Sequence, residues 1–94
     1  MRPLMEMISP PLREEAYEEM KRALAEELRT VRRKRKLTQS ECARLIGSSQ
    51  SRVAKMESAD GSVTLDLLIR GLLELGRTRR EVAEILGVKG HQAA

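Results

Sequence analysis

The sequence predicts an all-α protein, and three observations support this. Along its 94 residues, apolar side chains recur at spacings of three and four, the period of one helix face. Serine, threonine and glycine residues stand where short helices would begin and end. The chain contains one tyrosine and no tryptophan or phenylalanine, so its core must be built from leucine, isoleucine, valine, methionine and alanine, a mixture that packs helices rather than a β-sandwich or barrel.

The first expected helix runs from about Pro11 to Lys34. Ser9 supplies a capping hydroxyl, and prolines suit a first turn because their missing amide hydrogens cost little there. We expect the residues before Ser9 to be loosely held. One side of this helix is apolar and consists of Tyr17, Met20, Leu24, Leu28 and Val31.

Local capping chemistry places the next two helices. Thr38 and Glu41 form a capping box, in which the threonine oxygen accepts an amide hydrogen and the glutamate reaches back to the amide of Thr38. Gly47 can adopt the left-handed conformation that ends this second helix. Ser49 can then cap a third helix over residues 50–57.

Two further helices are marked in the same way. Thr64 caps the fourth helix, which is rich in leucine and ends before Gly76. Thr78 and Glu81 repeat the capping-box spacing and open the fifth. The sequence therefore predicts five helices joined by short turns.

The charged side chains are unevenly distributed. The net charge of +4 combines four basic and seven acidic side chains in residues 1–27, nine and two in residues 28–58, and five and five in residues 59–94. Positive charge gathered in the middle third is typical of a polyanion-binding surface, since each lysine or arginine near a phosphate releases condensed counterions. A solvated helix face is the alternative interpretation of the same charges.

The second and third helices have the apolar spacing of a helix-turn-helix over residues 39–58. Ala43 must be small because the two helices touch there, and Gly47 must tolerate a positive φ in the turn. The expected core of the motif consists of Cys42, Ala43, Ile46, Gly47, Val53 and Met56, with Leu45 completing the apolar side of the second helix.

The segment from about Leu28 to Leu75 resembles the lambda-repressor-like (Cro, XRE) helix-turn-helix family. The matching elements are LRTVRRKRKLTQ, the ARLIG step, SSQSRV, the glutamate of KMES and the helix that begins TLDLLIRGLLELG. The resemblance implies a five-helix lambda-repressor-like DNA-binding domain with an extended N-terminal helix. It also implies a sequence-specific regulator of transcription that binds double-stranded DNA.

The resemblance assigns base contacts to Gln50, Ser51 and Lys55 on the outward face of the recognition helix. Glutamine can hold adenine with two hydrogen bonds, and lysine can reach the acceptors of guanine. The resemblance assigns a phosphate to Gln39, where the helix N-terminus adds its partial positive charge. We expect the remaining phosphate contacts from Ser49, Arg52, Arg33, Arg35 and Lys36.

Two further features concern the recognition helix. Its first turn has no acidic residue and contains Arg52, which costs on the order of 0.3 to 1 kcal/mol unless an outside anion such as DNA compensates the helix dipole. Arg32 and Glu57 match positions that often form an ion pair, which would orient this helix. A surface salt bridge worth less than about 1 kcal/mol is the alternative.

Several other function classes lack the residues they need. The single histidine, His91, and the single cysteine, Cys42, have no catalytic partner, and no phosphate loop, dinucleotide fingerprint or metal-ligand spacing is present. Single-strand binders stack bases on exposed aromatic rings, and this chain has a single aromatic side chain, Tyr17. We therefore expect no enzyme and no cofactor. Without a signal peptide or a run of about 20 apolar residues, we expect a cytoplasmic protein with no membrane partner.

The expected organisation is an N-terminal tail and acidic amphipathic helical extension (1–27), a helix-turn-helix domain (28–87) and a disordered tail (88–94). The favoured function is a homodimeric repressor that binds a pseudo-palindromic operator through half-sites about 34 Å apart. The fourth and fifth helices, with Gly71 permitting close approach, are the expected dimer surface. The alternative is a HigA-type antitoxin that sequesters a basic toxin and autoregulates its promoter. A co-regulator that binds only protein is a third hypothesis.

Overall fold

The computed structural model describes residues 10–87, with side chains from residue 13 onward. This part of the chain forms five α-helices and no strand: α2 (Pro10–Lys34), α3 (Gln39–Ile46), α4 (Gln50–Glu57), α5 (Leu65–Glu74) and α6 (Arg79–Gly87). The all-α prediction is confirmed, and the helices begin and end within two residues of the expected positions. The expected loose N-terminus and the tail over residues 88–94 lie outside the described residues.

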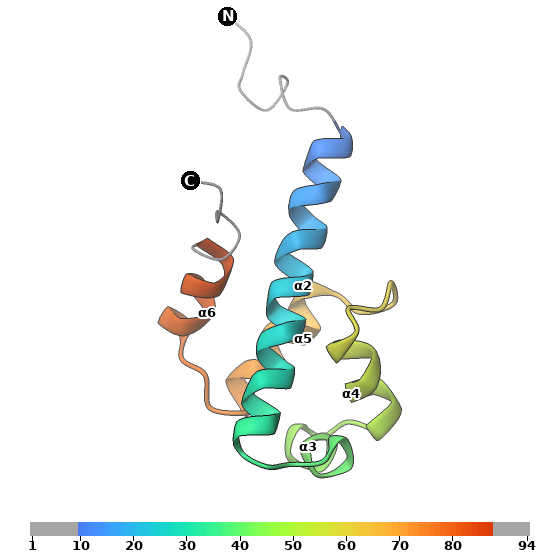
Figure 1. Cartoon of the computed structure of the whole chain (residues 1–94), viewed down its shortest axis with the longest axis vertical. Coiled ribbons are helices and arrows are strands. Elements are labelled where there is room, and N and C mark those ends of the chain that lie inside the picture. The colour runs from blue at the N-terminus through green and yellow to red at the C-terminus, as the bar shows by residue number, and fades with distance from the viewer. Residues whose placement is uncertain (1–9, 88–94) are drawn as a thin grey trace, which may run out of the picture.

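The long helix α2 forms the spine of the molecule, and the four short helices gather around its C-terminal part (Figure 1). Helix α2 packs against α4, α5 and α6, whereas α3 packs against α4 and α5. The first turns of α2 extend beyond the other helices. The helix-turn-helix pair α3–α4 therefore rests on a platform made by α2 and α5.

The core begins earlier in α2 than the expected domain boundary at residue 28. Leu24 is fully buried and Ala25 is 2% exposed, although both were expected to belong to the extension. Tyr17 belongs to the same apolar stripe of the sequence but is 37% exposed, so it lies outside this core. The fully buried large side chains of the core are Leu24, Leu28, Met56, Leu68, Leu72, Val53 and Cys42.

The expected caps are present. The Thr38 hydroxyl accepts from the amide of Glu41 at 3.0 Å, and the Glu41 carboxylate accepts from the amide of Thr38 at 2.8 Å. These bonds hold the pKa of Glu41 below its ordinary value, and the bond from the backbone amide of Thr38 has the larger effect. Thr78 and Glu81 form the same reciprocal pair at the start of α6.

Two sequence expectations about packing are wrong. Leu45 is 51% exposed, because α3 buries a narrow stripe formed by Cys42 and Ala43 and Leu45 lies beyond its edge. Gly71 is buried inside the subunit: a Cβ there would lie 2.9 Å from Met56 Cε. The missing side chain makes room for the methyl group of Met56 inside the subunit, so Gly71 is not available to a second subunit.

The turn after α2 contains a left-handed residue that the sequence did not predict. Lys36 has φ 56°, and its amide donates to the carbonyl of Arg33 at 2.9 Å, while that of Leu37 donates to Arg32 at 3.0 Å. This is the Schellman arrangement, in which glycine is the preferred residue at the left-handed position.

We expect Lys36→Gly to raise the free energy of unfolding by about 0.5–1 kcal/mol, because glycine adopts a positive φ without steric cost. Lys34→Gly removes the same charge from the last helical residue and is the matched control; it should lower stability by about 1 kcal/mol. Urea denaturation measures both. Changes of the same sign in the two variants would contradict the expectation.

Candidate nucleic-acid interface

The turn between α3 and α4 fixes the angle of the recognition helix. Gly47 has φ 68°, and the amide of Ser48 donates to the carbonyl of Ala43 at 2.8 Å. Ser49 caps α4 by accepting from the amide of Arg52 at 3.2 Å. The inner side of the pair is closed by buried Cys42, Ala43, Val53 and Met56 and by half-buried Ile46.

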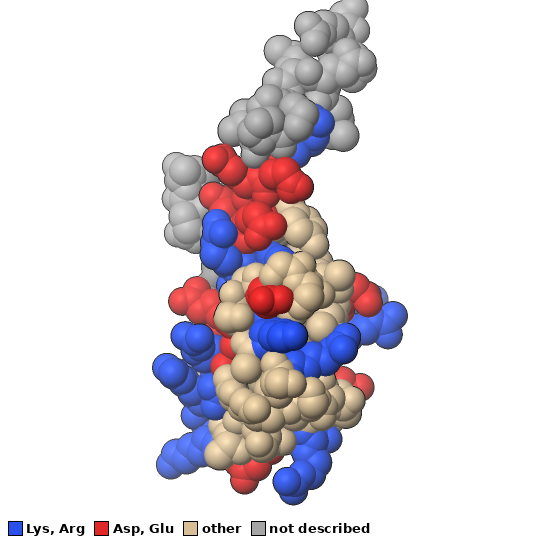
Figure 2. All heavy atoms as spheres, turned by 90° about the vertical axis from the view of Figure 1, so that its right-hand side faces the viewer, with Lys and Arg blue, Asp and Glu red and all other residues tan. Residues whose placement is uncertain are grey.

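The outward face of α4 is polar. Gln50, Ser51, Arg52 and Lys55 are all exposed, and α4 has no acidic residue in its first turn. Figure 2 shows that lysine and arginine side chains lie mainly over the lower half of the molecule, whereas acidic side chains gather at its upper end. The recognition helix therefore presents hydrogen-bonding groups at the positively charged end.

A partly buried ion pair connects α2 to the end of α4. Arg32 Nη2 donates to Glu57 Oε1 at 3.0 Å, and Arg32 Nε donates to Glu57 Oε2. Glu57 is 6% exposed, and Arg29 Nε lies 3.7 Å from its Oε1. The expected pair is thus confirmed as a bidentate, interior one, which differs from the surface salt bridge considered as the alternative.

Gln39 extends this connection to the recognition helix. Its Nε2 donates to Glu57 Oε1 at 3.2 Å, and its Oε1 accepts from Gln50 Nε2 at 2.7 Å. A continuous set of side-chain hydrogen bonds thus runs from Arg32 through Glu57 and Gln39 to Gln50. The arrangement fixes the orientation of the Gln50 amide and leaves the second Nε2 hydrogen of Gln39 for a phosphate.

The pKa of Glu57 reflects this environment. Burial would raise the pKa, but the hydrogen bonds from Arg32 and Gln39 and the charges of Arg32 and Arg29 outweigh burial, so the pKa lies below its ordinary value. A carboxyl group with a lowered folded-state pKa adds stability above its unfolded pKa of about 4.3, and this stability is lost as pH falls.

We therefore expect the difference in unfolding free energy between the wild type and Glu57→Gln to be constant above about pH 5 and to shrink below it, as the unfolded pKa is passed. Urea denaturation at a series of pH values measures this difference. Glu41→Gln is a matched comparison for the pH dependence of the unfolding free energy, because Glu41 also has a lowered pKa but is exposed, whereas Glu57 is buried. A Glu57 difference that does not change down to acidic pH would contradict the interpretation.

The structure distinguishes among the three predicted phosphate contacts that follow Arg32, namely Arg33, Arg35 and Lys36. Arg33 and Lys36 are exposed at the end of α2. Arg35 instead donates from Nη1 to the carbonyl of Leu75 at 3.1 Å and so connects the end of α2 to the end of α5. Phosphate contacts of all three remain predictions, and Arg35 would bind phosphate with the donors it has left.

A shallow groove of about 250 Å³ runs beside α4 and is lined by Ser49, Ser51, Arg52, Lys55 and Ser62, among others. Ser62 was not singled out from the sequence. Its amide and hydroxyl both donate to Asp60 Oδ2, at 2.9 and 2.6 Å, which holds the loop after α4 against the groove. The spacing of Asp60 and Ser62 indicates a local turn, but it does not predict that Ser62 lies beside α4.

Within residues 10–87, no group of three or more histidine, cysteine, aspartate or glutamate side chains is placed to hold a metal ion. None of the described helices has the length and apolar character needed to cross a bilayer. A family model described as helix-turn-helix matches residues 28–70, which include all of α3 and α4. No curated protein matches the chain, and no solved structure does.

Proposed function

The chain belongs to the lambda-repressor-like (Cro/C1-type) helix-turn-helix family of DNA-binding transcription regulators, and from this premise we propose that it represses transcription as a homodimer on a pseudo-palindromic operator. The observation that carries the proposal is the exposed polar face of α4, with Gln50 held in place by Gln39. An α-helix fits the major groove of B-DNA, where each base pair presents a distinct pattern of donors and acceptors.

A dimer is favoured by the outward side of α5. Leu73 is 42% exposed there, and its neighbours Asp66 and Arg70 carry opposite charges that form an exposed ion pair at 3.0 Å. Around a two-fold axis, such a mixed-charge surface can pair with its own copy. We expect Leu73→Asp to weaken dimerisation in sedimentation experiments, with Leu45→Asp as the control, because Leu45 is an exposed leucine on α3.

Selection of bound sites from random duplex DNA tests the proposal most directly. We expect enrichment of two inverted half-sites with centres about one helical turn apart, because the two recognition helices are related by a two-fold axis. Enrichment of isolated half-sites would contradict the dimer, and no enrichment of any sequence would contradict the specific regulator.

A second candidate function, an antitoxin that sequesters a basic partner protein, is favoured by the start of α2. The apolar core begins at Leu24, and Lys21 is the first buried side chain among residues 13–87, so the turns before it add no core residue. Those turns are acidic: Glu14, Glu15 and Glu19 are exposed, and Glu18 is half-buried. A surface of this composition would attract a basic protein.

Deletion of residues 1–19 separates the two functions better than a deletion to residue 27, because it leaves Leu24 in place. The antitoxin hypothesis requires the truncated chain to keep duplex binding and to lose a basic partner encoded beside it. Loss of the dimer in sedimentation would instead assign the extension to assembly.

A further inference from the structure

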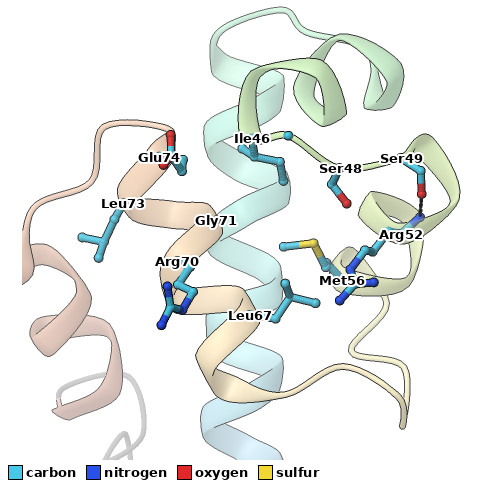
Figure 3. A pocket seen from close by; sticks show the side chains of 11 residues that line it. Ile46, Ser48, Ser49, Arg52, Met56, Leu67, Arg70, Gly71, Leu73 and Glu74 are labelled. Atoms are coloured by element: carbon cyan, nitrogen blue, oxygen red, sulfur yellow. Dashed lines mark hydrogen bonds between the residues drawn. The ribbon is translucent and has the colours of Figure 1, made fainter.

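A groove of about 690 Å³ lies between the α3–α4 turn, α4 and α5 (Figure 3). Its volume falls within the range of small-molecule sites. Ile46 and Leu67 give it half-buried apolar walls, and Met56 and Gly71 close it below. The close approach of Met56 Cε to Gly71 leaves the floor without a further side chain.

One polar group in this groove lacks a partner. The Oγ atom of Ser48 is shielded from solvent, and no described residue forms a hydrogen bond with it. In Figure 3 this oxygen points into the space between Ile46 and Met56. Buried hydroxyl groups in native proteins are nearly always paired, so an acceptor in the groove would satisfy it.

The groove also carries cationic groups on facing helices. Arg52 extends from α4 over Met56, and within the described residues it forms no ion pair. Arg70 lines the groove from α5, and in the described part of the chain its ion-pair partner is Asp66, in a bridge whose two side chains are 75% and 73% exposed. Glu74 lies farther along α5, so the Arg52 end favours a negative charge.

We propose that this groove binds a small organic carboxylate with a compact apolar body. The apolar body lies between Ile46 and Leu67, one carboxylate oxygen accepts from Ser48 Oγ, and the guanidinium of Arg52 pairs with the carboxylate. Arginine suits this role because its planar donors match a carboxylate in two parallel hydrogen bonds.

The same site would regulate DNA binding, a consequence that rests on the proposed function. Arg52 is an expected phosphate contact, and Ser49, at the edge of the groove, caps α4. A carboxylate that occupies Arg52 competes with the phosphate and therefore lowers the affinity for duplex DNA. By linkage, duplex DNA lowers the affinity for the carboxylate by the same factor.

Benzoate is a suitable probe, with benzamide as its uncharged control of the same shape. Titration of the ¹⁵N-labelled full-length chain into the millimolar range should give saturable amide shifts at residues 47–49, Arg52 and Gly71. We expect benzamide to bind about tenfold more weakly, because it cannot form the charge-assisted pair with Arg52. Ser48→Ala and Arg52→Gln should weaken benzoate to a similar extent, whereas Arg80→Gln on α6 should not.

Equal binding of benzoate and benzamide, or unchanged benzoate binding by Ser48→Ala and Arg52→Gln, would overturn the proposed site. Duplex affinity of the wild type, measured at constant ionic strength, should fall when benzoate saturates the protein, and an unchanged affinity would overturn the coupling. A chain that binds no duplex would instead contradict the proposed function, and the titration of the free protein would still decide whether the groove binds a carboxylate.

Discussion

We expect Arg32→Met to lower the free energy of unfolding by about 3–5 kcal/mol, because it leaves the buried carboxylate of Glu57 without its bidentate partner. Gln39 and the more distant Arg29 still face Glu57, so the loss should fall toward the lower end of this range. Small domains have only about 5–15 kcal/mol of total stability, so the variant should unfold at much lower urea concentration.

Arg29→Met is the matched control, since it removes an arginine of the same helix that lies 3.7 Å from the same carboxylate but is 48% exposed at its side chain. An exposed pair of this kind is worth less than about 1 kcal/mol. The double variant Arg32→Met/Glu57→Met should regain most of the lost stability, because no unpaired charge stays buried. If Arg32→Met cost no more than Arg29→Met, the proposed importance of the interior pair would be refuted.

The fold could be predicted from local chemistry because its helix ends are encoded by neighbouring residues. Thr38 and Glu41 lie three residues apart, and their reciprocal bonds need no information from the rest of the chain. The left-handed turn at Gly47 is marked by the residue type itself. Lys36 occupies an equivalent left-handed position after α2. Lysine is not a residue type that favours a positive φ, so this conformation could not be predicted from the sequence.

The candidate site could be predicted in its parts but not in its connections. The sequence indicated which side of α4 faces outward, because burial repeats with the helical period. It did not indicate that Gln39 would bond to both Glu57 and Gln50, since these contacts span 18 and 11 residues and depend on the crossing of helices.

Arg77 shows the same limit outside the site. Its Nε lies 3.0 Å from Glu27 Oε2 on α2, and its Nη1 donates to Glu81 Oε2 on α6 at 2.8 Å. The pair with Glu81 follows from a spacing of four residues, which sequence alone can suggest. The pair with Glu27 depends on how α6 packs against α2, and a local sequence pattern does not predict that packing.

The second large effect concerns sequence preference. In Gln50, one Nε2 hydrogen is donated to Gln39 Oε1 at 2.7 Å, which leaves the other hydrogen and Oε1 for a base. One donor beside one acceptor matches N7 and the N6 amino group of adenine in the major groove. Gln50→Ala should therefore reduce discrimination at one base pair of each half-site by about 1–3 kcal/mol.

Lys55 lies on the next turn of α4 and is expected to read a different base pair, so the effects of Gln50→Ala and Lys55→Ala should add and remove most of the sequence preference. Nonspecific affinity should largely remain, because arginine and lysine contacts with phosphate do not depend on sequence. Competition between duplexes that differ at single base pairs, at fixed salt concentration, measures both quantities.

Gln39→Ala tests whether the fixed orientation of Gln50 matters, because Gln39 donates to Glu57 and holds Gln50 without being assigned a base. Preference at the Gln50 base pair should fall in this variant, although Gln50 itself is intact. Glu84→Gln, an exposed change on α6, is the control and should leave every preference unchanged. If Gln50→Ala retained the wild-type preference at all base pairs, α4 would not be reading DNA through Gln50, and the alignment of the recognition helix in the groove would have to be reassigned.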